Sequence, residues 1–532
     1  MRCVEMSLRA DRRSVEPGAV VSLAVVVELV AHGQAVEAER PPMACALALD
    51  VSGSMQGEPI EQLITSVDKL TELCSPTDRL AVAVFSDGAS EVVPLTPMDP
   101  AGRRLVRSRV HRLAANGRTN LEAGLEKAAA LLSSAPEHCR RSVLLLSDGV
   151  PNVGRTSTDS LAELVRGYRG RLSVSSLGYG PDHHEDVLAR IAEAGGGAYR
   201  FIPHPASCRR ELAQALGAQG DVVVDGLELT LVPAEGVEIV QLYGAHRPRF
   251  GAGLTLPLAD MEDGGRQRVA LELRLTRPLS ADGELLRARL AHRVASSREL
   301  CEESARATID VKRGPSEVDV EGLRGVLLVR GEATRAAARA QADRQGFEGA
   351  AATLRAFLRE VDASPGFVAD DGSELAELRE ALLDEAVAYE RRPTAEAYST
   401  FRKHTMVSKL SFDAASVPSR TSKAFHTATA GNFPEAYVVV LEGPSAGARH
   451  RLRESNPLGR TKAAAIVLPS PSVSRMHAEI YALEGDYWIC DLGTTNSTVV
   501  NGKRLGQAPH KLEPGDEIAL GEVRLRYEQV AS

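Results

Sequence analysis

The spacing of apolar residues changes along the chain, and each change marks a region of different secondary structure. Residues 43–50 form an unbroken apolar run that ends in a carboxylate, a pattern typical of a strand buried on both faces of a parallel sheet. Helical and strand-like patterns then alternate. The helical stretches cover residues 58–74, 100–114, 121–133, 159–168 and 184–194, and the strand-like stretches cover residues 80–85, 91–95, 142–147, 171–177 and 198–202. This alternation predicts a doubly wound, Rossmann-like α/β domain over residues 43–205.

The regions on either side of this domain have strand patterns instead. Residues 220–312 show several apolar, β-branched runs separated by turns, and residues 1–40 show the same pattern. Forty residues are too few to bury a core of their own. We therefore predict that residues 1–40 and 220–312 pair into one β-sandwich, into which the α/β domain is inserted.

Three further regions follow towards the C-terminus. Residues 316–408 carry apolar stripes at helical spacing and predict three or four packed helices. Residues 411–432 are rich in Ser, Thr and Ala and are typical of a flexible linker. Residues 433–530 consist of short strand-like runs separated by Gly, Pro and Asn, which predicts a C-terminal all-β sandwich.

Composition narrows the classes of function. The 532 residues are enough for about three to five domains. The 63 Lys and Arg against 71 Asp and Glu give a net charge of −8, which offers no reason to bind nucleic acid or an anionic membrane. No apolar stretch predicts membrane insertion or secretion. Seven scattered cysteines without a C-x-x-C pair favour a reducing, cytoplasmic location.

Oxygen-bearing side chains gather where the apolar strands of the α/β domain end. Asp50, Ser52 and Ser54 follow the first strand at alternate positions. Thr119 lies in a loop that opens a helix, and Asp148 follows another buried strand. Ligand sites of open α/β sheets form at the carboxyl ends of the strands, and hard oxygen ligands suit Mg²⁺ or Mn²⁺.

These five residues resemble the metal-ion-dependent adhesion site of von Willebrand factor A (VWA) domains. The resemblance implies that Ser52, Ser54 and Thr119 ligate the metal directly, and that Asp50 and Asp148 act directly or through water. It also implies that a partner protein completes the coordination with an Asp or Glu. The alternative is a domain that kept the motif for helix capping and binds no metal.

The C-terminal region carries three motifs in a specific order. They are Leu458–Arg460, Ser474–Ala478 and Leu492–Thr498, the last followed by Asn501. The set resembles a forkhead-associated (FHA) domain over residues 433–530. That resemblance implies an all-β fold that binds phosphothreonine peptides.

The side chains in these motifs suit a phosphate ligand. A phosphothreonine carries nearly two negative charges and three acceptor oxygens, so Arg460 can form a charge-assisted bond and Ser474 can donate its hydroxyl. By resemblance, Thr495 and Asn496 shape the peptide-binding loop, and Asn496 bonds the ligand backbone. Arg475 adds a phosphate or peptide contact.

Other residues of the motifs have structural parts. By resemblance, Gly459 and His477 support the loop scaffold, and Asn501 orders the following turn. The family has Gly where this chain has Ser497, which is strained if the position needs positive φ. The alternative is a degenerate fold that binds protein without phosphate.

No nucleotide-binding loop, kinase signature, serine-hydrolase elbow or zinc-protease motif is present, so we expect a binding protein and not an enzyme. The first hypothesis is a phosphorylation-dependent adaptor. Phosphorylation of Thr421, Thr427 or Thr429 in the linker could also let the chain bind itself or another copy. The second hypothesis is an accessory subunit of an AAA+ ATPase or of a secretion machine.

Overall fold

The computed structural model describes most of the 532 residues. The described residues are 3–18, 21–32, 42–148, 150–179, 185–202, 212, 222–243, 248–251, 253–279, 281–295, 297, 299–369, 373–393, 434–453, 455–461, 464–483, 485–492, 494, 496–505 and 509–530. The predicted linker 411–432, with Thr421, Thr427 and Thr429, and the site residue Thr495 lie outside them.

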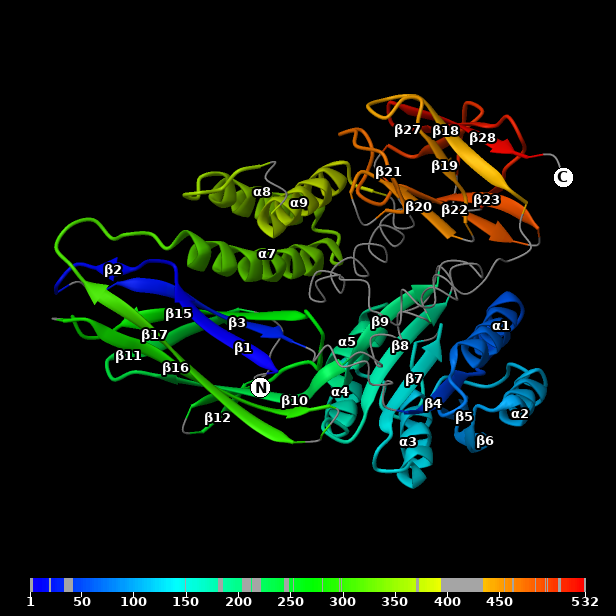
Figure 1. Ribbon diagram of the computed structural model, residues 1–532, viewed down its shortest axis with the longest axis horizontal. Coiled ribbons are helices and arrows are strands. Elements are labelled where there is room, and N and C mark those ends of the chain that lie inside the picture. Colours follow the sequence, from blue (N-terminus) through cyan, green and yellow to red (C-terminus); the bar gives the residue numbers. More distant parts are fainter. Residues whose placement is uncertain are drawn as a thin grey trace. The chain divides into compact units, whose positions relative to one another are not determined.

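The first β-sandwich is built from both ends of the region that encloses the α/β domain. One sheet has the order β1 (Val4–Ala10), β3 (Ser22–Ala31), β15 (Arg266–Leu275) and β11 (Val237–Tyr243). The other has the order β12 (Arg249–Phe250), β13 (Leu254–Pro257), β10 (Val222–Pro233), β16 (Gly283–Val294), β17 (Leu300–Val311) and β2 (Ser14–Val15), with β14 (Met261–Glu262) beside β10. In Figure 1 the blue N-terminal strands lie among the green ones.

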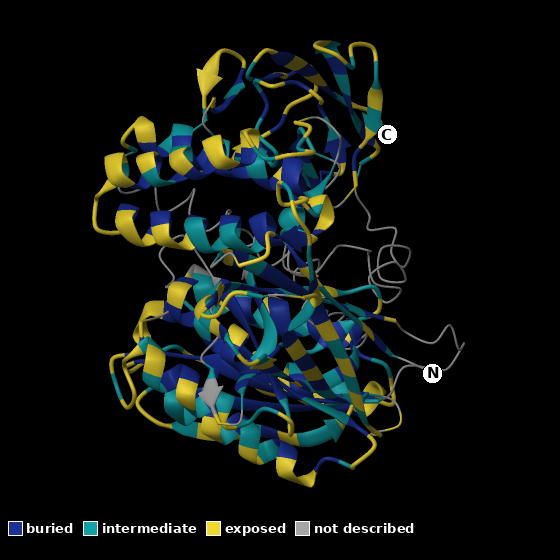
Figure 2. Cartoon of the chain, turned by 90° about the vertical axis from the view of Figure 1, so that its left-hand side faces the viewer, coloured by how far each residue is buried: buried dark blue, intermediate teal, exposed yellow. Residues whose placement is uncertain are grey.

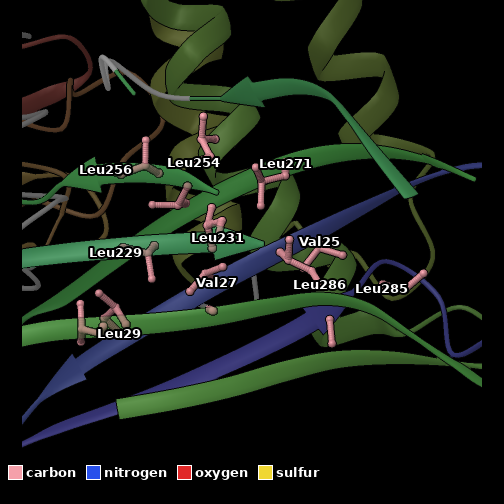
Figure 3. Close-up of a cluster of buried hydrophobic side chains, with 14 of the residues drawn as sticks. Val25, Val27, Leu29, Leu229, Leu231, Leu254, Leu256, Leu271, Leu285 and Leu286 are labelled. Atoms are coloured by element: carbon pink, nitrogen blue, oxygen red, sulfur yellow. The ribbon is translucent and has the colours of Figure 1, made fainter. Parts of the chain in front are cut away.

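The core of this sandwich lies between the two sheets. Alternate residues of β3, among them Val25, Val27 and Leu29, are buried and point towards Leu229 and Leu231 of β10 (Figure 3). Strand residues alternate between the two faces of a sheet, so β3 contributes one full face to this core. The N-terminal strands are therefore integral to the sandwich, as the pattern predicts.

Among the described residues, three helices follow the sandwich: α7 (Val320–Ala342), α8 (Phe347–Asp362) and α9 (Glu374–Glu390). Their buried and exposed stripes are visible in Figure 2. Helix α7 packs on β3 and β15. A Cβ atom at Gly322 would meet the carbonyl oxygen of Ala10 at 2.0 Å, and one at Gly325 would meet Val26 at 2.9 Å. These glycines let the helix approach the sheet closely, so α7 belongs to the same compact unit as the sandwich.

The α/β domain has one six-stranded sheet. Its order is β6 (Ala89–Pro97), β5 (Arg79–Phe85), β4 (Met43–Asp50), β7 (Arg140–Ser147), β8 (Ser173–Tyr179) and β9 (Gly196–Ile202), and only β6 is antiparallel. In the part of the domain that the structure describes, the helical elements are η1 (Gly53–Met55), α1 (Glu58–Leu73), α2 (Pro100–Val110), α3 (Leu121–Leu131), η2 (Leu132–Ser134), α4 (Thr158–Arg166) and α5 (Glu185–Gly195).

Helices cover both faces of this sheet. Alternate residues of β4, such as Leu47 and Leu49, pack with α1 and α2, whereas Ala46 and Ala48 pack on the other face with α3, α4 and α5. The central strand is therefore apolar at every position, which explains its unbroken run in the sequence.

The C-terminal region is a second sandwich. One sheet has the order β19 (Arg449–Arg451), β18 (Ala436–Glu442), β28 (Val523–Gln529), β27 (Glu517–Leu520), β24 (Thr498–Val500) and β25 (Lys503–Arg504). The other has the order β21 (Ile466–Val467), β20 (Ser455–Gly459), β22 (Ala478–Leu483), β23 (Asp486–Asp491) and β26 (His510–Lys511).

The predicted fold class is confirmed: an α/β domain inserted in a β-sandwich, then helices, then a C-terminal β-sandwich. No helix among the described residues is long and apolar enough to cross a membrane.

Candidate functional sites

The first candidate site lies at the carboxyl edge of the parallel sheet. After β4 the chain forms β5 on one side and later β7 on the other, so the strand order reverses at β4. Asp50 is the last residue of β4, Ser147 is the last residue of the neighbouring strand β7, and Asp148 follows it. The topology thus brings two carboxylates that are far apart in the sequence to one edge.

Hydrogen bonds join four of the five predicted metal ligands. The Ser52 backbone N–H donates to Asp50 Oδ1 at 2.9 Å. The hydroxyls of Ser52 and Ser54 lie 3.1 Å apart, and Ser54 Oγ–H donates to Asp148 Oδ1 at 2.9 Å. These bonds therefore link the four residues into one chain at the sheet edge.

The fifth predicted ligand, Thr119, lies in a loop that docks beside the others. The Gly53 N–H donates to the Gly117 carbonyl at 2.9 Å, and the Asn116 N–H donates to the Val51 carbonyl at 2.7 Å. Thr119 itself is buried, and its N–H donates to Asn152 Oδ1 at 2.8 Å. The loop that carries Thr119 is thus fixed from both sides.

The two carboxyl groups at this edge, Asp50 and Asp148, lie where a negative charge is poorly solvated. Burial raises the pKa of Asp50 to about 6, although bonds from Ser147 and Ser52 lower it and Asp148 raises it further. Burial also raises the pKa of Asp148. Charged groups in a poorly solvated site are costly unless an opposite charge compensates them. A divalent cation would supply that charge, so the donor set fits one.

The ligand chemistry is restricted to oxygen. Among the residues that the structure describes, no group of three or more His, Cys, Asp or Glu side chains could hold a metal ion. A metal here would have to be held by the two carboxylates together with Ser and Thr hydroxyls. Such all-oxygen sets suit Mg²⁺ or Mn²⁺ and not Zn²⁺.

The second candidate site lies at one end of the C-terminal sandwich. The Arg460 N–H donates to the Ser474 carbonyl at 2.9 Å, which fixes the two residues side by side. A Cβ atom at Gly459 would lie 1.9 Å from the carbonyl oxygen of Arg475, so only Gly allows this approach. Arg460, Ser474 and Arg475 are all half-buried.

His477 and Asn496 tie the neighbouring loops together. The Ser474 N–H donates to His477 Nδ1 at 3.0 Å, and burial lowers the pKa of His477, so the ring is held neutral. Asn496 is exposed, and its Nδ2–H donates to the Ser472 carbonyl at 2.8 Å. Ser497 has φ +50°, so the position where the family has Gly is in the left-handed region.

Asn501 lies on a separate turn. Its Nδ2–H donates to Asp516 Oδ1 at 2.7 Å, and its Oδ1 accepts from the Glu517 N–H at 2.9 Å. It thus joins β24 and β27, and these bonds are independent of Arg460 and Ser474. Thr495 lies outside the described residues.

Comparison with known proteins agrees with both folds. The von Willebrand factor type A domain pattern matches residues 45–150, and the FHA domain pattern matches residues 457–521. The oxoglutarate dehydrogenase inhibitor of Corynebacterium efficiens is 37% identical over 138 residues, which cover 25% of this chain and 89% of that protein. The chain belongs to the FHA-domain proteins and also carries a VWA domain.

Two further relatives concern the VWA domain. Human inter-alpha-trypsin inhibitor heavy chain H4 is 33% identical over 169 residues, which cover 30% of this chain and only 18% of the heavy chain. The solved structure of a von Willebrand factor type A protein from Catenulispora acidiphila has a TM-score of 0.52 at 17% identity, covering 76% of this chain and 89% of that one. At this low identity, the similarity to the Catenulispora protein shows a shared fold only.

Sequence reasoning missed several residues that hold the two sites. In the VWA domain, Ser147 Oγ–H donates to Asp50 Oδ2 at 2.5 Å. In the FHA domain, Asp491 Oδ2 accepts from the Thr498 N–H at 2.6 Å and from its hydroxyl at 2.7 Å. Ser147 stands directly before Asp148 in the motif, which was a usable signal. No sequence signal pointed to Asp491, since its partner Thr498 lies on another strand.

Proposed function

We propose that this VWA–FHA protein is a phosphorylation-dependent adaptor that joins two protein partners without chemical conversion. The FHA domain binds a phosphothreonine segment of one partner through Arg460 and Ser474, with Arg475, Thr495 and Asn496 at its rim. The VWA domain binds a carboxylate of another partner through a divalent metal.

The observation that carries the proposal is the backbone bond between Arg460 and Ser474. It holds a cationic and a hydroxyl donor next to each other on loops that His477 and Asn496 also fix. Fixed donors bind phosphate better than mobile ones, because less conformational entropy is lost on binding. The FHA-domain relative from Corynebacterium is named as an inhibitor of an enzyme, which supports a protein as the target.

The metal half of the proposal rests on the hydrogen bonds that link Asp50, Ser52, Ser54 and Asp148 and on the docked loop of Thr119. When bound, Mg²⁺ or Mn²⁺ would offer an open coordination position to an acidic side chain. The chain's own residues position that cation and keep it at the sheet edge, where a partner can reach the exposed Ser54.

A phosphothreonine peptide library tests the phosphate half on the full chain. Arg460→Ala should weaken the selected peptides by about 2–3 kcal/mol, because a charge-assisted bond is lost. Arg524→Ala is the matched control, since Arg524 is an exposed arginine on β28 in the other sheet. Equal binding of phosphorylated and unphosphorylated peptides would contradict the proposal.

The same experiment separates the adaptor from a machine subunit. Partners captured from cells by the wild-type chain should be lost with Arg460→Ala and after phosphatase treatment. Recovery of an ATPase or of secretion components that is independent of Arg460 would favour the accessory-subunit hypothesis.

The chain itself is a further candidate ligand. Phosphorylation of Thr421, Thr427 or Thr429 would place a phosphothreonine just before the FHA domain, where a short tether gives a high effective concentration. Replacing all three by Ala in a kinase-treated chain should then improve binding of an added phosphopeptide. No change would exclude self-binding through these residues.

A further inference from the structure

Two cysteines lie at the starts of two neighbouring strands of the first β-sandwich. Cys3 directly precedes β1, and Cys301 is the second residue of β17. The two strands lie side by side (Figure 1), with Cα atoms within 8 Å of each other. That is closer than the spacing of about 10 Å between stacked sheets, so the two sheets approach each other along β1 and β17.

The directions of the strands place both cysteines at the same end of the sandwich. After β1 the chain enters β2, in which Ser14 pairs in parallel with Asp310 at the far end of β17. Each cysteine comes about ten residues before this pair, Cys3 before Ser14 and Cys301 before Asp310. Because extended strands rise by a constant step per residue, both cysteines reach the same level of the sandwich.

The backbone beside each cysteine is held by hydrogen bonds. The His32 N–H donates to the Cys3 carbonyl at 2.8 Å, which extends the β1–β3 ladder by one residue. The Val294 N–H donates to the Glu299 carbonyl at 2.9 Å and closes the β16–β17 hairpin next to Cys301. Both cysteines are half-buried reduced thiols, so a small molecule can reach them.

A buried histidine faces Cys301. His292 of β16 lies directly opposite Cys301 in the antiparallel ladder, and directly opposed residues point to the same face of a sheet. His292 is 1% exposed, and neither ring nitrogen has a hydrogen-bond partner among the described residues. Burial lowers the pKa of His292, although Glu303 raises it, so the ring is neutral and able to accept a proton. Buried polar groups without a partner are rare, which makes this ring a candidate for chemistry.

The charges that act on Cys301 identify its neighbours. Burial raises the pKa of the Cys301 thiol, and Glu299, Cys3 and Glu303 raise it further. Cys3 is therefore near enough to act on the Cys301 sulfur through its charge. A raised pKa keeps Cys301 protonated at neutral pH, and a protonated thiol is a poor nucleophile. Cys301 consequently needs a base, and the neutral ring of His292 stands opposite it.

We propose that Cys3 and Cys301 form a reversible disulfide when the protein meets a low-molecular-weight disulfide, and that His292 accepts the proton of Cys301. The Cys3 thiolate attacks one sulfur of the oxidant, whose S–S bond breaks, and one thiolate leaves with the proton that Cys3 lost. His292 then takes the Cys301 proton, and the Cys301 sulfur attacks Cys3. The second thiolate leaves and receives that proton, so two electrons have passed from the cysteines to the oxidant.

The bridge would tie β1 to β17 and so join the two sheets covalently. The loop that it closes runs from Cys3 to Cys301 and contains the VWA domain. A cross-link that closes a long loop restricts the unfolded chain strongly. In a reducing compartment both cysteines stay thiols, so the bridge forms only under oxidation. It uses neither the metal nor the phosphate site and is therefore tested separately from the proposed function.

Peptide mass spectrometry of the full chain under non-reducing conditions tests the bridge. The reduced protein is treated with oxidised glutathione and then alkylated. The peptides of Cys3 and Cys301 should appear linked, and both thiols should be lost to alkylation. Cys45 is the internal control, since it is fully buried and burial raises its pKa to about 12, so it should stay reduced.

A serine variant supplies the matched comparison. In Cys301→Ser the linked peptide should be absent, and Cys3 should retain glutathione because no second thiol displaces it. Hydrogen exchange of β1 should be slower in the oxidised wild type than in the reduced wild type, because the bridge holds the start of this strand. In Cys301→Ser the exchange of β1 should not respond to the oxidant.

The part of His292 is tested by rate against equilibrium. His292→Gln should slow bridge formation by at least about tenfold, because a proton acceptor is lost, and should leave the thiol–disulfide equilibrium in a glutathione buffer unchanged. His111→Gln is the matched control, since His111 is an exposed histidine of the VWA domain. A shifted equilibrium at an unchanged rate would give His292 a structural role only and overturn its part in the proposal.

Two results would overturn the bridge itself. Unmodified thiols, or glutathione retained on both cysteines without a linked peptide, would show that the two sulfurs do not meet. A covalent dimer on a non-reducing gel that requires Cys3 would assign the oxidation to two copies of the chain. Circular dichroism checks that all variants stay folded.

Discussion

The two candidate sites of this chain are assembled in opposite ways. The VWA site is acidic and lies at the edge of a parallel sheet, where Asp50 is fully buried at a strand end. The FHA site is basic and lies on loops between antiparallel strands, where Arg460 and Ser474 are half-buried. The first site therefore holds a buried negative charge, and the second holds a half-buried positive charge.

The difference follows from the two folds. Parallel strands all end at the same edge, so the residues after β4 and β7 are brought together there before any side-chain contact forms. Hydrogen bonds such as that of Ser54 to Asp148 then hold them. Antiparallel loops have no such common edge. The FHA loops are therefore held one by one, through Gly459 against Arg475, Ser474 on His477 and Asn496 on the Ser472 carbonyl. The order of the strands brings the residues of the first site together, whereas single contacts position each loop of the second site.

The largest expected effect is at Asp50. Asp50→Asn should weaken Mg²⁺ or Mn²⁺ binding by about 100-fold or more, since loss of even an indirect ligand contact costs about 10- to 100-fold. The pKa of Asp50 is raised to about 6, above its ordinary 3.8, so the ionised group destabilises the metal-free fold at neutral pH. Without metal, Asp50→Asn should therefore melt higher than the wild type.

Calorimetry with each metal and melting curves with and without chelator measure both effects. Glu163→Gln is the control, since Glu163 is an exposed carboxylate on α4 that Arg166 pairs at 2.8 Å. If metal-free Asp50→Asn melted at a lower temperature than the metal-free wild type, ionised Asp50 would not be destabilising the fold.

The next effect tests whether the FHA loops depend on individual contacts. Gly459→Ala should destabilise the FHA domain by about 1–3 kcal/mol, because its Cβ overlaps the Arg475 carbonyl. Gly485→Ala meets nothing within 4 Å but has φ +88°, so it measures the cost of backbone strain alone. Denaturant unfolding followed by Trp488 emission compares them. If both variants lost the same free energy of unfolding, the close approach of Gly459 to Arg475 would not be what requires glycine.

The smallest effect concerns the position where the family has Gly. Ser497→Gly should stabilise the FHA domain by up to about 1 kcal/mol, because φ +50° suits Gly better than Ser. Asn501 has a similar φ of +49° but holds Asp516 and Glu517, so Asn501→Gly should destabilise. The same unfolding experiment measures both variants. If both were stabilised or both destabilised, the predicted difference between Ser497 and Asn501 would be wrong.

Much of this arrangement could be predicted from the sequence. The unbroken run before Asp50 predicted a strand covered on both faces, and Leu47 and Ala48 do pack on opposite layers. The motifs around Arg460 and Ser474 predicted an FHA domain. The supports could not be predicted, because Asn152 is far in the sequence from Thr119, whose N–H it accepts, and because Asp491 and Thr498 meet only when β23 and β24 fold together.

The helical region shows the same limit. Its apolar stripes predicted helices, yet nothing predicted that Arg335 and Glu385 would be an ion pair about 1% exposed within the bundle, with Arg339 bonding the same carboxylate at 2.8 Å. A buried pair of this kind is stable only when further hydrogen bonds satisfy it.

The sequence by itself determined the order and type of the elements and predicted the residues of both candidate sites, because hydrophobic period and motif spacing are local properties of the chain. The tertiary structure decided which distant segments pair and which faces are covered. It joined β3 to β15 across the inserted domain, laid α7 on that sheet, and buried Tyr481 on the outer side of another. Burial and long-range pairing depend on what the rest of the chain places beside a residue, and no local pattern contains that information.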